Sequence, residues 1–341
     1  MPETLADIGE FGLIDRIDTL LQTAGARVPE ATLGIGDDCA LFQPRAGYEL
    51  LVTCDAMVEG RHYLPQFISS LSLGRRAMTL NISDIAAMGG TPLYALISLG
   101  LRPDMPVEDV EAIYLGFVEE LNPFDAVIIG GNVTKAAGAN FIDITLIGEI
   151  EAGTSVRRST ARPGNAILVT GYPGQAAAGL QILLAGRAGP DLESHPLVRV
   201  YNTPVHRARE GRAVARSGLA TAMIDTSDGL LGDLGHICRE SGVGARIAQE
   251  NLPVSRPLRE TAGQMKQDPM DFVLKESDDY ELIITCTPEH VDEIRSLITA
   301  QSPIPVTEIG RITDLSGDIT LTSSDGVSRT IDPSGWDHFA K

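Results

Sequence analysis

Short acidic segments interrupt the apolar runs of this chain and constrain its fold more than any other feature. The first is Gly34-Ile35-Gly36-Asp37-Asp38, where two adjacent carboxylates precede an apolar run that ends at Phe42. A buried carboxylate is costly unless cations, amide donors or water surround it. We therefore predict that the fold gathers several aspartates around bound cations; unrelated caps and turns are the alternative. Four further acidic segments follow: Thr53-Cys54-Asp55, Asn81-Ile82-Ser83-Asp84, Asp225-Thr226-Ser227-Asp228-Gly229 and Ser277-Asp278-Asp279-Tyr280.

Length and charge limit the class of protein. The 341 residues are enough for two halves with separate cores. A formal net charge of -19 argues against nucleic-acid binding, which needs a basic face, but leaves a phosphate substrate open because metal ions can supply positive charge. The four cysteines lack a CxxC spacing, which favours free thiols. No signal-peptide pattern and no apolar run of roughly 18 residues occur, so we expect a cytoplasmic protein without membrane partners.

Apolar periodicity predicts helices alternating with strands. The polar, turn-rich segment 157–164 is the best candidate boundary, and we expect domains over 1–150 and 151–341. Each half is expected to send a strand through an acidic segment into a helix that carries Ser-Asp, a weak internal repeat. The pattern predicts helices over 10–24, 70–88, 107–121, 174–184, 205–216, 225–241 and 288–300, and strands over 34–42, 49–57, 93–101, 126–129, 141–150, 166–170 and 222–224.

The aspartates suit Mg²⁺, which takes oxygen ligands in octahedral geometry and often binds substrate phosphates. They lie at strand ends or helix starts, where ligand sites of α/β folds collect. On a strand Asp37 and Asp38 would face opposite sides, so only one of them can look at a given site. The candidates are Asp38, Asp55, Asp84, Asp225 and Asp228.

Nucleotide and substrate contacts are less specific in the sequence. No P-loop and no GxGxxG signature occurs, and Gly130-Gly131-Asn132 reads equally as a phosphate-binding turn or an ordinary turn. His62 is a ligand candidate or an ordinary hydrogen-bonded histidine. Trp336, the single tryptophan, is either an anchor of the tail or a platform for a flat ligand ring. No Ser-His-Asp or Cys-His arrangement can be assembled, so nucleophilic catalysis has no support.

Taken together, these motifs resemble the thiamine-monophosphate kinase family, whose superfamily also holds aminoimidazole ribonucleotide synthetase and selenophosphate synthetase. The resemblance runs nearly end to end, from Gly9-Glu10-Phe11-Gly12 to Gly335-Trp336-Asp337-His338-Phe339. It implies transfer of the ATP γ-phosphate to thiamine monophosphate, with several Mg²⁺ ions and often K⁺. It also implies an α/β fold of the α+β type, like aminoimidazole ribonucleotide synthetase, with two halves of mixed sheets covered by helices. The N-terminal half would bind metal and ATP and join two subunits in a homodimer.

The resemblance also assigns roles to individual residues. It implies no protein base, because the acceptor phosphate oxygen is already ionised and catalysis depends on cations. Trp336 would stack on the thiamine moiety. The implied metal ligands are Asp38, Thr53, the backbone at Cys54, Asp55, Asp84, Asn132, Asp225 and Asp228; the implied ATP contacts are Tyr114, Gly131, Asn132, Arg158 and Ser227; the implied substrate contacts are His62, Asp278 and Trp336.

Two positions depart from the family pattern. Asn132 stands where the family usually has the aspartate of Gly-Gly-Asp-Thr, and an amide oxygen can ligate Mg²⁺ without the carboxylate charge. Asp278 stands where the family usually has the glutamate of Gly-Gly-Glu, which shortens a substrate-facing acid by one methylene. Two alternatives therefore stay open: a superfamily relative that acts on another phosphate acceptor, and a non-catalytic nucleotide-binding homologue.

Overall fold

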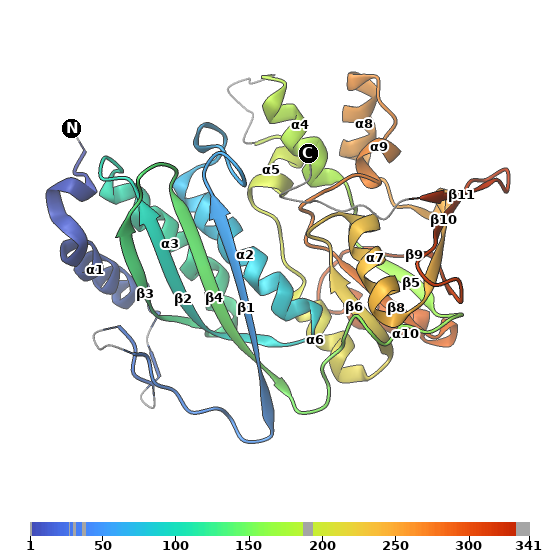
Figure 1. The fold of residues 1–341 in the computed structure, drawn as a ribbon, viewed down its shortest axis with the longest axis horizontal. Coiled ribbons are helices and arrows are strands. Elements are labelled where there is room, and N and C mark those ends of the chain that lie inside the picture. The colour runs from blue at the N-terminus through green and yellow to red at the C-terminus, as the bar shows by residue number, and fades with distance from the viewer. Residues whose placement is uncertain (1, 27, 30–31, 36–38, 187–193, 332–341) are drawn as a thin grey trace. The chain divides into compact units, whose positions relative to one another are not determined.

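The computed structural model describes residues 2–26, 28–29, 32–35, 39–186 and 194–331, and Figure 1 traces them. Contacts divide the chain into two units, Met1–Ile85 with Gly90–Ala152 and Ala86–Gly89 with Gly153–Lys341. Each unit is built around one sheet. Two residues of the predicted site, Asp38 and Trp336, lie outside the described residues. Among the described helices, none combines the length and the apolar character needed to cross a membrane.

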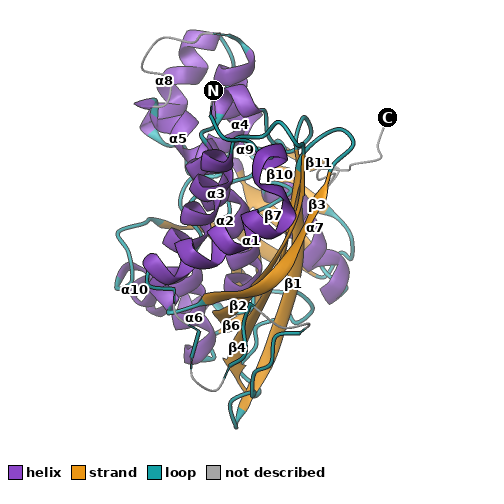
Figure 2. Cartoon of the chain, turned by 90° about the vertical axis from the view of Figure 1, so that its left-hand side faces the viewer, coloured by secondary structure: helices purple, strands orange, loops and turns teal. Residues whose placement is uncertain are grey.

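The first unit contains a four-stranded sheet in the order β1-β4-β2-β3. β3 runs parallel to β2, and the other neighbours are antiparallel. Along β4, buried Ile142, Ile144 and Leu146 alternate with half-buried residues, the pattern of a sheet with one covered face. Helices α2 and α3 lie on the same side of this sheet (Figure 2). The elements are α1 Leu5–Thr23, β1 Tyr48–Val58, α2 Ser70–Ala87, β2 Thr91–Leu101, α3 Val107–Leu121, β3 Val127–Lys135 and β4 Phe141–Glu151.

The second unit contains a seven-stranded mixed sheet in the order β11-β10-β7-β9-β5-β8-β6. Strands β5 and β8 are buried along their whole length, which explains their uninterrupted apolar sequences. Its strands are β5 Ala166–Thr170, β6 Ala220–Asp225, β7 Gly244–Ala248, β8 Leu282–Cys286, β9 Val306–Thr313, β10 Ile319–Thr322 and β11 Ser328–Ile331. Its helices are α4 Gln175–Leu184, α5 Pro196–Asn202, α6 Ala208–Ser217, α7 Leu230–Ser241, α8 Arg256–Met265, α9 Met270–Val273 and α10 Val291–Thr299.

The predicted α/β fold with mixed sheets and covering helices is confirmed, and the helix over 107–121 and the strand over 166–170 have the predicted bounds. The strand predicted over 34–42 is wrong for the described residues of that stretch, of which Leu41 forms only an isolated bridge with Leu33. Glycine and adjacent acids are poor strand residues, and apolar content alone does not create a pairing partner.

Two further differences concern the acidic segments. Ser227 and Asp228 precede α7 instead of lying on it, because Gly229 occupies the N-cap with a φ of 100°. β3 continues through Gly130, Gly131 and Asn132, which makes this stretch a strand and not a turn.

Strands β7, β9, β10 and β11 and helices α5 and α8 were not predicted. β7, for example, depends on pairing with β10, where Ala245 meets Ile319, and such distant pairing leaves little local signal.

Candidate functional site

In the first unit, β1 presents Thr53 and Asp55 on the face of the sheet that α2 covers. The two residues are separated by one position, so they share a face of the strand, and both are half-buried. The Thr53 hydroxyl donates a hydrogen bond to the Asp84 carboxylate of α2. This face therefore carries a hydroxyl and two carboxylates, a donor set that suits Mg²⁺. β1 is an edge strand of the described sheet, so one of its two sides faces no neighbouring strand among the described residues.

Cys54 and Asn132 lie on the opposite face of this sheet. The Cys54 Sγ contacts Asp143 Oδ1 at 3.4 Å. Pairing places Ser98 opposite both Asp143 on β4 and Asn132 on β3, and paired residues share a face. The structure of this unit therefore does not bring the Asn132 side chain to Asp55 and Asp84. The family resemblance had implied that all three residues are metal ligands. The reason for this difference is strand alternation, which the extended β3 imposes on residue 132.

Gly131 is required by the close pairing of β3 with β2. A Cβ atom at this position would collide with the Ile97 carbonyl of β2. The absent side chain therefore serves strand packing, and the Gly-Gly segment is not by itself a sign of phosphate binding.

Tyr114 and His62 both have structural contacts within the first unit. Tyr114 is 4% exposed, and its ring meets Phe117 edge-on with centroids 5.3 Å apart. Burial raises the pKa of Tyr114, which marks a phenol held in the core. His62 is half-buried, and its Nδ1 accepts a hydrogen bond from the Val58 N–H at 3.0 Å. The neutral His62 ring therefore carries its proton on Nε2.

In the second unit, the turn between β6 and α7 holds three predicted site residues. Asp225 ends β6 and is 3% exposed, while Ser227 and Asp228 are half-buried in the following loop. Arg158 lies close enough for its charge to act on Asp233 and His236 of α7. The structure therefore groups the predicted ATP contacts Arg158 and Ser227 with the predicted metal ligands Asp225 and Asp228.

Asp233 belongs to this group and was missed by the sequence analysis. It is 2% exposed, and its Oδ2 accepts a hydrogen bond from the Asp228 N–H at 3.0 Å. Burial, followed by the charges of Asp225 and Asp228, raises the pKa of Asp233 well above its ordinary value. Ligand atoms of Asp228, Asp233 and His236 all lie within 4.8 Å of one another. A signal was present, since Asp233 is also an acid inside an apolar run, Leu230 to Leu234.

The carboxylate oxygens of Asp225, Asp228 and Asp233 suit a divalent cation. Three carboxylates repel one another in a largely buried place, and burial, together with this repulsion, raises the pKa of Asp233. A bound Mg²⁺ would relieve it, because its charge favours the ionised form of each carboxylate.

Asp278 differs from its acidic neighbours Asp279 and Glu281, whose carboxylates are bound by other groups of the second unit. The Asp279 carboxylate accepts hydrogen bonds from the backbone N–H groups of Gly174 and, at 2.9 Å, Ala176, at the start of α4. Glu281 is 5% exposed and accepts a bidentate pair of bonds from Arg207. Asp278 is half-buried, more exposed than either neighbour, with its Oδ1 3.4 Å from the Tyr280 hydroxyl. Its exposure makes it the acid of this group best placed to meet a ligand.

Asp279→Asn is expected to remove a pH dependence of stability. Burial raises the pKa of Asp279 from 3.8 to about 6, against the opposing hydrogen bonds from Ser277, Ala176 and Gly174. The folded state holds this proton more tightly than the unfolded state. The stabilisation is therefore complete below pH 3.8 and is lost as the pH rises through about 6. Between about pH 3 and about pH 7, the stability of the wild type should fall by about 3 kcal/mol relative to the variant.

Urea unfolding at several pH values measures this difference. Asp292→Asn is a suitable control, because the Asp292 side chain is 93% exposed. Parallel stability profiles for Asp279→Asn and the wild type would contradict the prediction.

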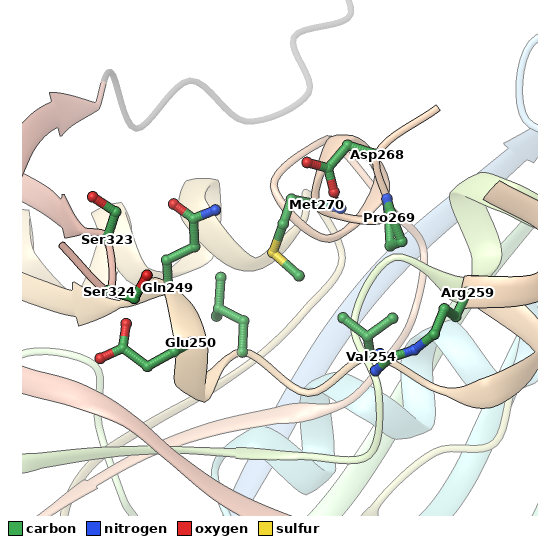
Figure 3. Close-up of a pocket in the computed structure, with 10 residues that line it drawn as sticks. Gln249, Glu250, Val254, Arg259, Asp268, Pro269, Met270, Ser323 and Ser324 are labelled. Carbon is green, nitrogen blue, oxygen red and sulfur yellow. Dashed lines mark hydrogen bonds between the residues drawn. The ribbon is translucent and has the colours of Figure 1, made fainter. Parts of the chain in front are cut away.

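A cavity of ≈ 360 Å³ also lies in the second unit, but no predicted site residue lines it. Its polar lining includes Gln249, Glu250, Arg259 and Asp268 (Figure 3). In Figure 3 the polar ends of these side chains are spread around the cavity and do not converge on one point. The cavity is therefore a weaker ligand-site candidate than the β6–α7 turn.

Comparison with known proteins identifies the family. Residues 36–150 match the model for AIR synthase related protein, N-terminal domain, and residues 162–321 match that for the C-terminal domain. Thiamine-monophosphate kinase of Salmonella typhimurium is 35% identical over 335 residues, which cover 97% of this chain and 98% of the relative. The chain belongs to the thiamine-monophosphate kinase family.

Solved structures of the thiamine-monophosphate kinase family have the same fold. The enzyme from Stenotrophomonas maltophilia K279a superposes with a TM-score of 0.79 at 34% identity, covering 93% of this chain and 97% of that chain. AaThiL complexed with AMPPCP and TMP superposes with a TM-score of 0.75 at 31% identity, covering 98% of both chains. These matches confirm the resemblance stated from the motifs.

Proposed function

We propose that this chain transfers the γ-phosphate of ATP to thiamine monophosphate and releases thiamine diphosphate and ADP. Its main support is similarity to thiamine-monophosphate kinases over nearly the full chain. AaThiL, which shares the fold over 98% of the chain, binds AMPPCP and TMP. The chain is thus an ATP-dependent kinase of thiamine biosynthesis.

The physical problem of this reaction is that both reacting phosphates are anionic. Mg²⁺, when bound, screens their charges and helps to align them for in-line transfer. We assign its ligands to Thr53, Asp55 and Asp84 in the first unit and to Asp225 and Asp228 in the second. Asp38 and the Cys54 backbone join them by family resemblance. Several Mg²⁺ ions, with K⁺ as a further cation, are part of the proposal.

The other site residues bind and orient the two substrates. Arg158 supplies positive charge to the ATP phosphates beside the Ser227 hydroxyl, and the guanidinium fork suits phosphate oxygens. His62 and Asp278 contact thiamine monophosphate, and Trp336 stacks on it. Gly131, Asn132 and Tyr114 complete the assigned ATP contacts by resemblance. Tyr114 is the least accessible of them, because its ring is buried. No residue is assigned as a general base, since the acceptor oxygen is ionised without one.

We further propose that the domain over 1–150 binds metal and ATP and forms a homodimer. The α/β domain over 151–341 adds the ATP contacts and metal ligands assigned above to Arg158, Asp225, Ser227 and Asp228. Val52 on β1 is 66% exposed and Leu50 is 39% exposed. Exposed apolar side chains on an edge strand of the described sheet favour pairing with another copy. A cytoplasmic location belongs to the same proposal, because the reaction consumes ATP.

A coupled assay tests the function directly. Purified protein with ATP, Mg²⁺ and thiamine monophosphate should release ADP and form an equal amount of thiamine diphosphate. ATP binding in calorimetry without ADP release would favour a non-catalytic nucleotide-binding homologue. ADP release with a different phosphate acceptor, but not with thiamine monophosphate, would favour a superfamily relative.

A further inference from the structure

Two loops of the second unit that carry predicted site residues are joined through Thr226. The Thr226 N–H donates to the Glu281 carbonyl at 2.8 Å, and the Tyr280 N–H donates to the Thr226 carbonyl at 2.9 Å. In addition, the Glu281 N–H donates to the Thr226 hydroxyl at 3.0 Å. One residue of the β6–α7 turn therefore holds the backbone of residues 280 and 281 by three hydrogen bonds.

Gly229 joins the same two loops at their other end. Its φ is 100°, and a Cβ atom there would stand 2.5 Å from the Lys275 carbonyl oxygen and 3.0 Å from the Glu276 Cα. The chain at 229 thus lies against residues 275 and 276. Contacts at both ends bracket Asp278 on one loop, and Ser227 and Asp228 on the other, so these residues run alongside one another.

We propose that Thr226 is a positioning residue that couples the ATP and metal side of the site to the substrate side. Through the Glu281 backbone, its hydroxyl sets where Asp278 stands relative to Ser227 and Asp228. Thr226 is 0% exposed, so it contacts no substrate itself. The inference depends on the proposed function, in which Asp278 binds thiamine monophosphate and Ser227 binds ATP. Coupling of this kind is reciprocal: a ligand that orders one loop orders the other.

Thr226→Val isolates the hydroxyl, because valine keeps the shape and leaves the Glu281 N–H without its acceptor. We expect about a tenfold rise in the KM for thiamine monophosphate with kcat changed by less than about twofold. Hydrogen exchange, followed by mass spectrometry over residues 277–284, should become about tenfold faster. Addition of AMPPCP should slow this exchange in the wild type and have less effect in the variant.

Two variants control for side effects. Thr226→Ser restores the acceptor and should return both KM and exchange to within about twofold of the wild type. Thr285→Val removes another fully buried hydroxyl, on the adjoining strand β8, which bonds to the Thr221 hydroxyl at 2.7 Å; this variant should leave the KM unchanged. If Thr226→Val does not fold, Thr226→Ala takes its place in both measurements.

A folded variant without the hydroxyl that keeps the wild-type KM and exchange would show that Thr226 does not couple the loops. An equal rise of KM in Thr285→Val would show a general loss of stability instead of positioning, and would also overturn the inference. If the wild type forms no thiamine diphosphate, the proposed function is wrong, and the exchange with and without AMPPCP still decides whether Thr226 couples the loops.

Discussion

Asp84→Asn is expected to lower kcat/KM for thiamine diphosphate formation by on the order of 100-fold at saturating Mg²⁺. Asparagine has the same shape and can still accept the hydrogen bond that the Thr53 hydroxyl donates to residue 84. The substitution therefore removes a charge and changes little else. Loss of one anionic ligand weakens the hold on a cation that must offset the charges of two phosphates. A coupled assay over a series of Mg²⁺ concentrations measures the loss.

Asp109→Asn is the matched control for this experiment. Asp109 is also a half-buried helical aspartate of the first unit, and its Oδ1 accepts a bond from the Ser70 hydroxyl at 2.6 Å. It is not among the assigned ligands, so its variant should retain activity within about threefold. Near wild-type activity of Asp84→Asn in saturating Mg²⁺ would remove Asp84 from the metal site.

Arg207→Met is expected to have the largest effect on stability, a loss of about 3–5 kcal/mol in the free energy of unfolding. The Arg207 Nε lies 2.6 Å from Glu281 Oε2, and the two side chains are only 12% and 6% exposed. Methionine fills much of the space but leaves the Glu281 carboxylate buried without its cation. Removing one member of a buried pair costs more than the pair itself contributes. Urea unfolding measures the loss.

Two comparisons test this explanation of the Arg207 effect. Arg256→Met breaks an ion pair with Glu260 of similar length, 2.7 Å, but at 88% and 56% exposure, and should change stability by less than about 1 kcal/mol. The double variant Arg207→Met with Glu281→Met should be more stable than Arg207→Met alone, because no charge stays buried. A double variant that is less stable would mean that the buried charge is not the main cost.

The candidate site could be predicted from the sequence only in part. Asp225, Ser227 and Asp228 are neighbours in the chain, so their grouping follows from one local motif. Asp233 lies inside an apolar run like the predicted acids, but only the structure shows that its carboxylate turns back to the Asp228 N–H at the start of α7. The environment of Asn132 was misjudged because the face of a strand residue depends on strand length and register. β3 was predicted to end before residue 132, but pairing with β2 carries it to Lys135.

The sequence by itself determined the family and the α/β class, and it predicts the chemical type of the site. These follow from ordered motifs and from the cost of burying carboxylates without partners, and both can be read locally. Tertiary structure alone decided which acids are available for chemistry. Asp278, Asp279 and Glu281 look alike in the sequence, yet Asp279 caps α4, Glu281 neutralises Arg207, and Asp278 is left more exposed. The physical reason is that the role of a carboxylate depends on the donors and cations around it, and α4 and Arg207 come from distant parts of the chain.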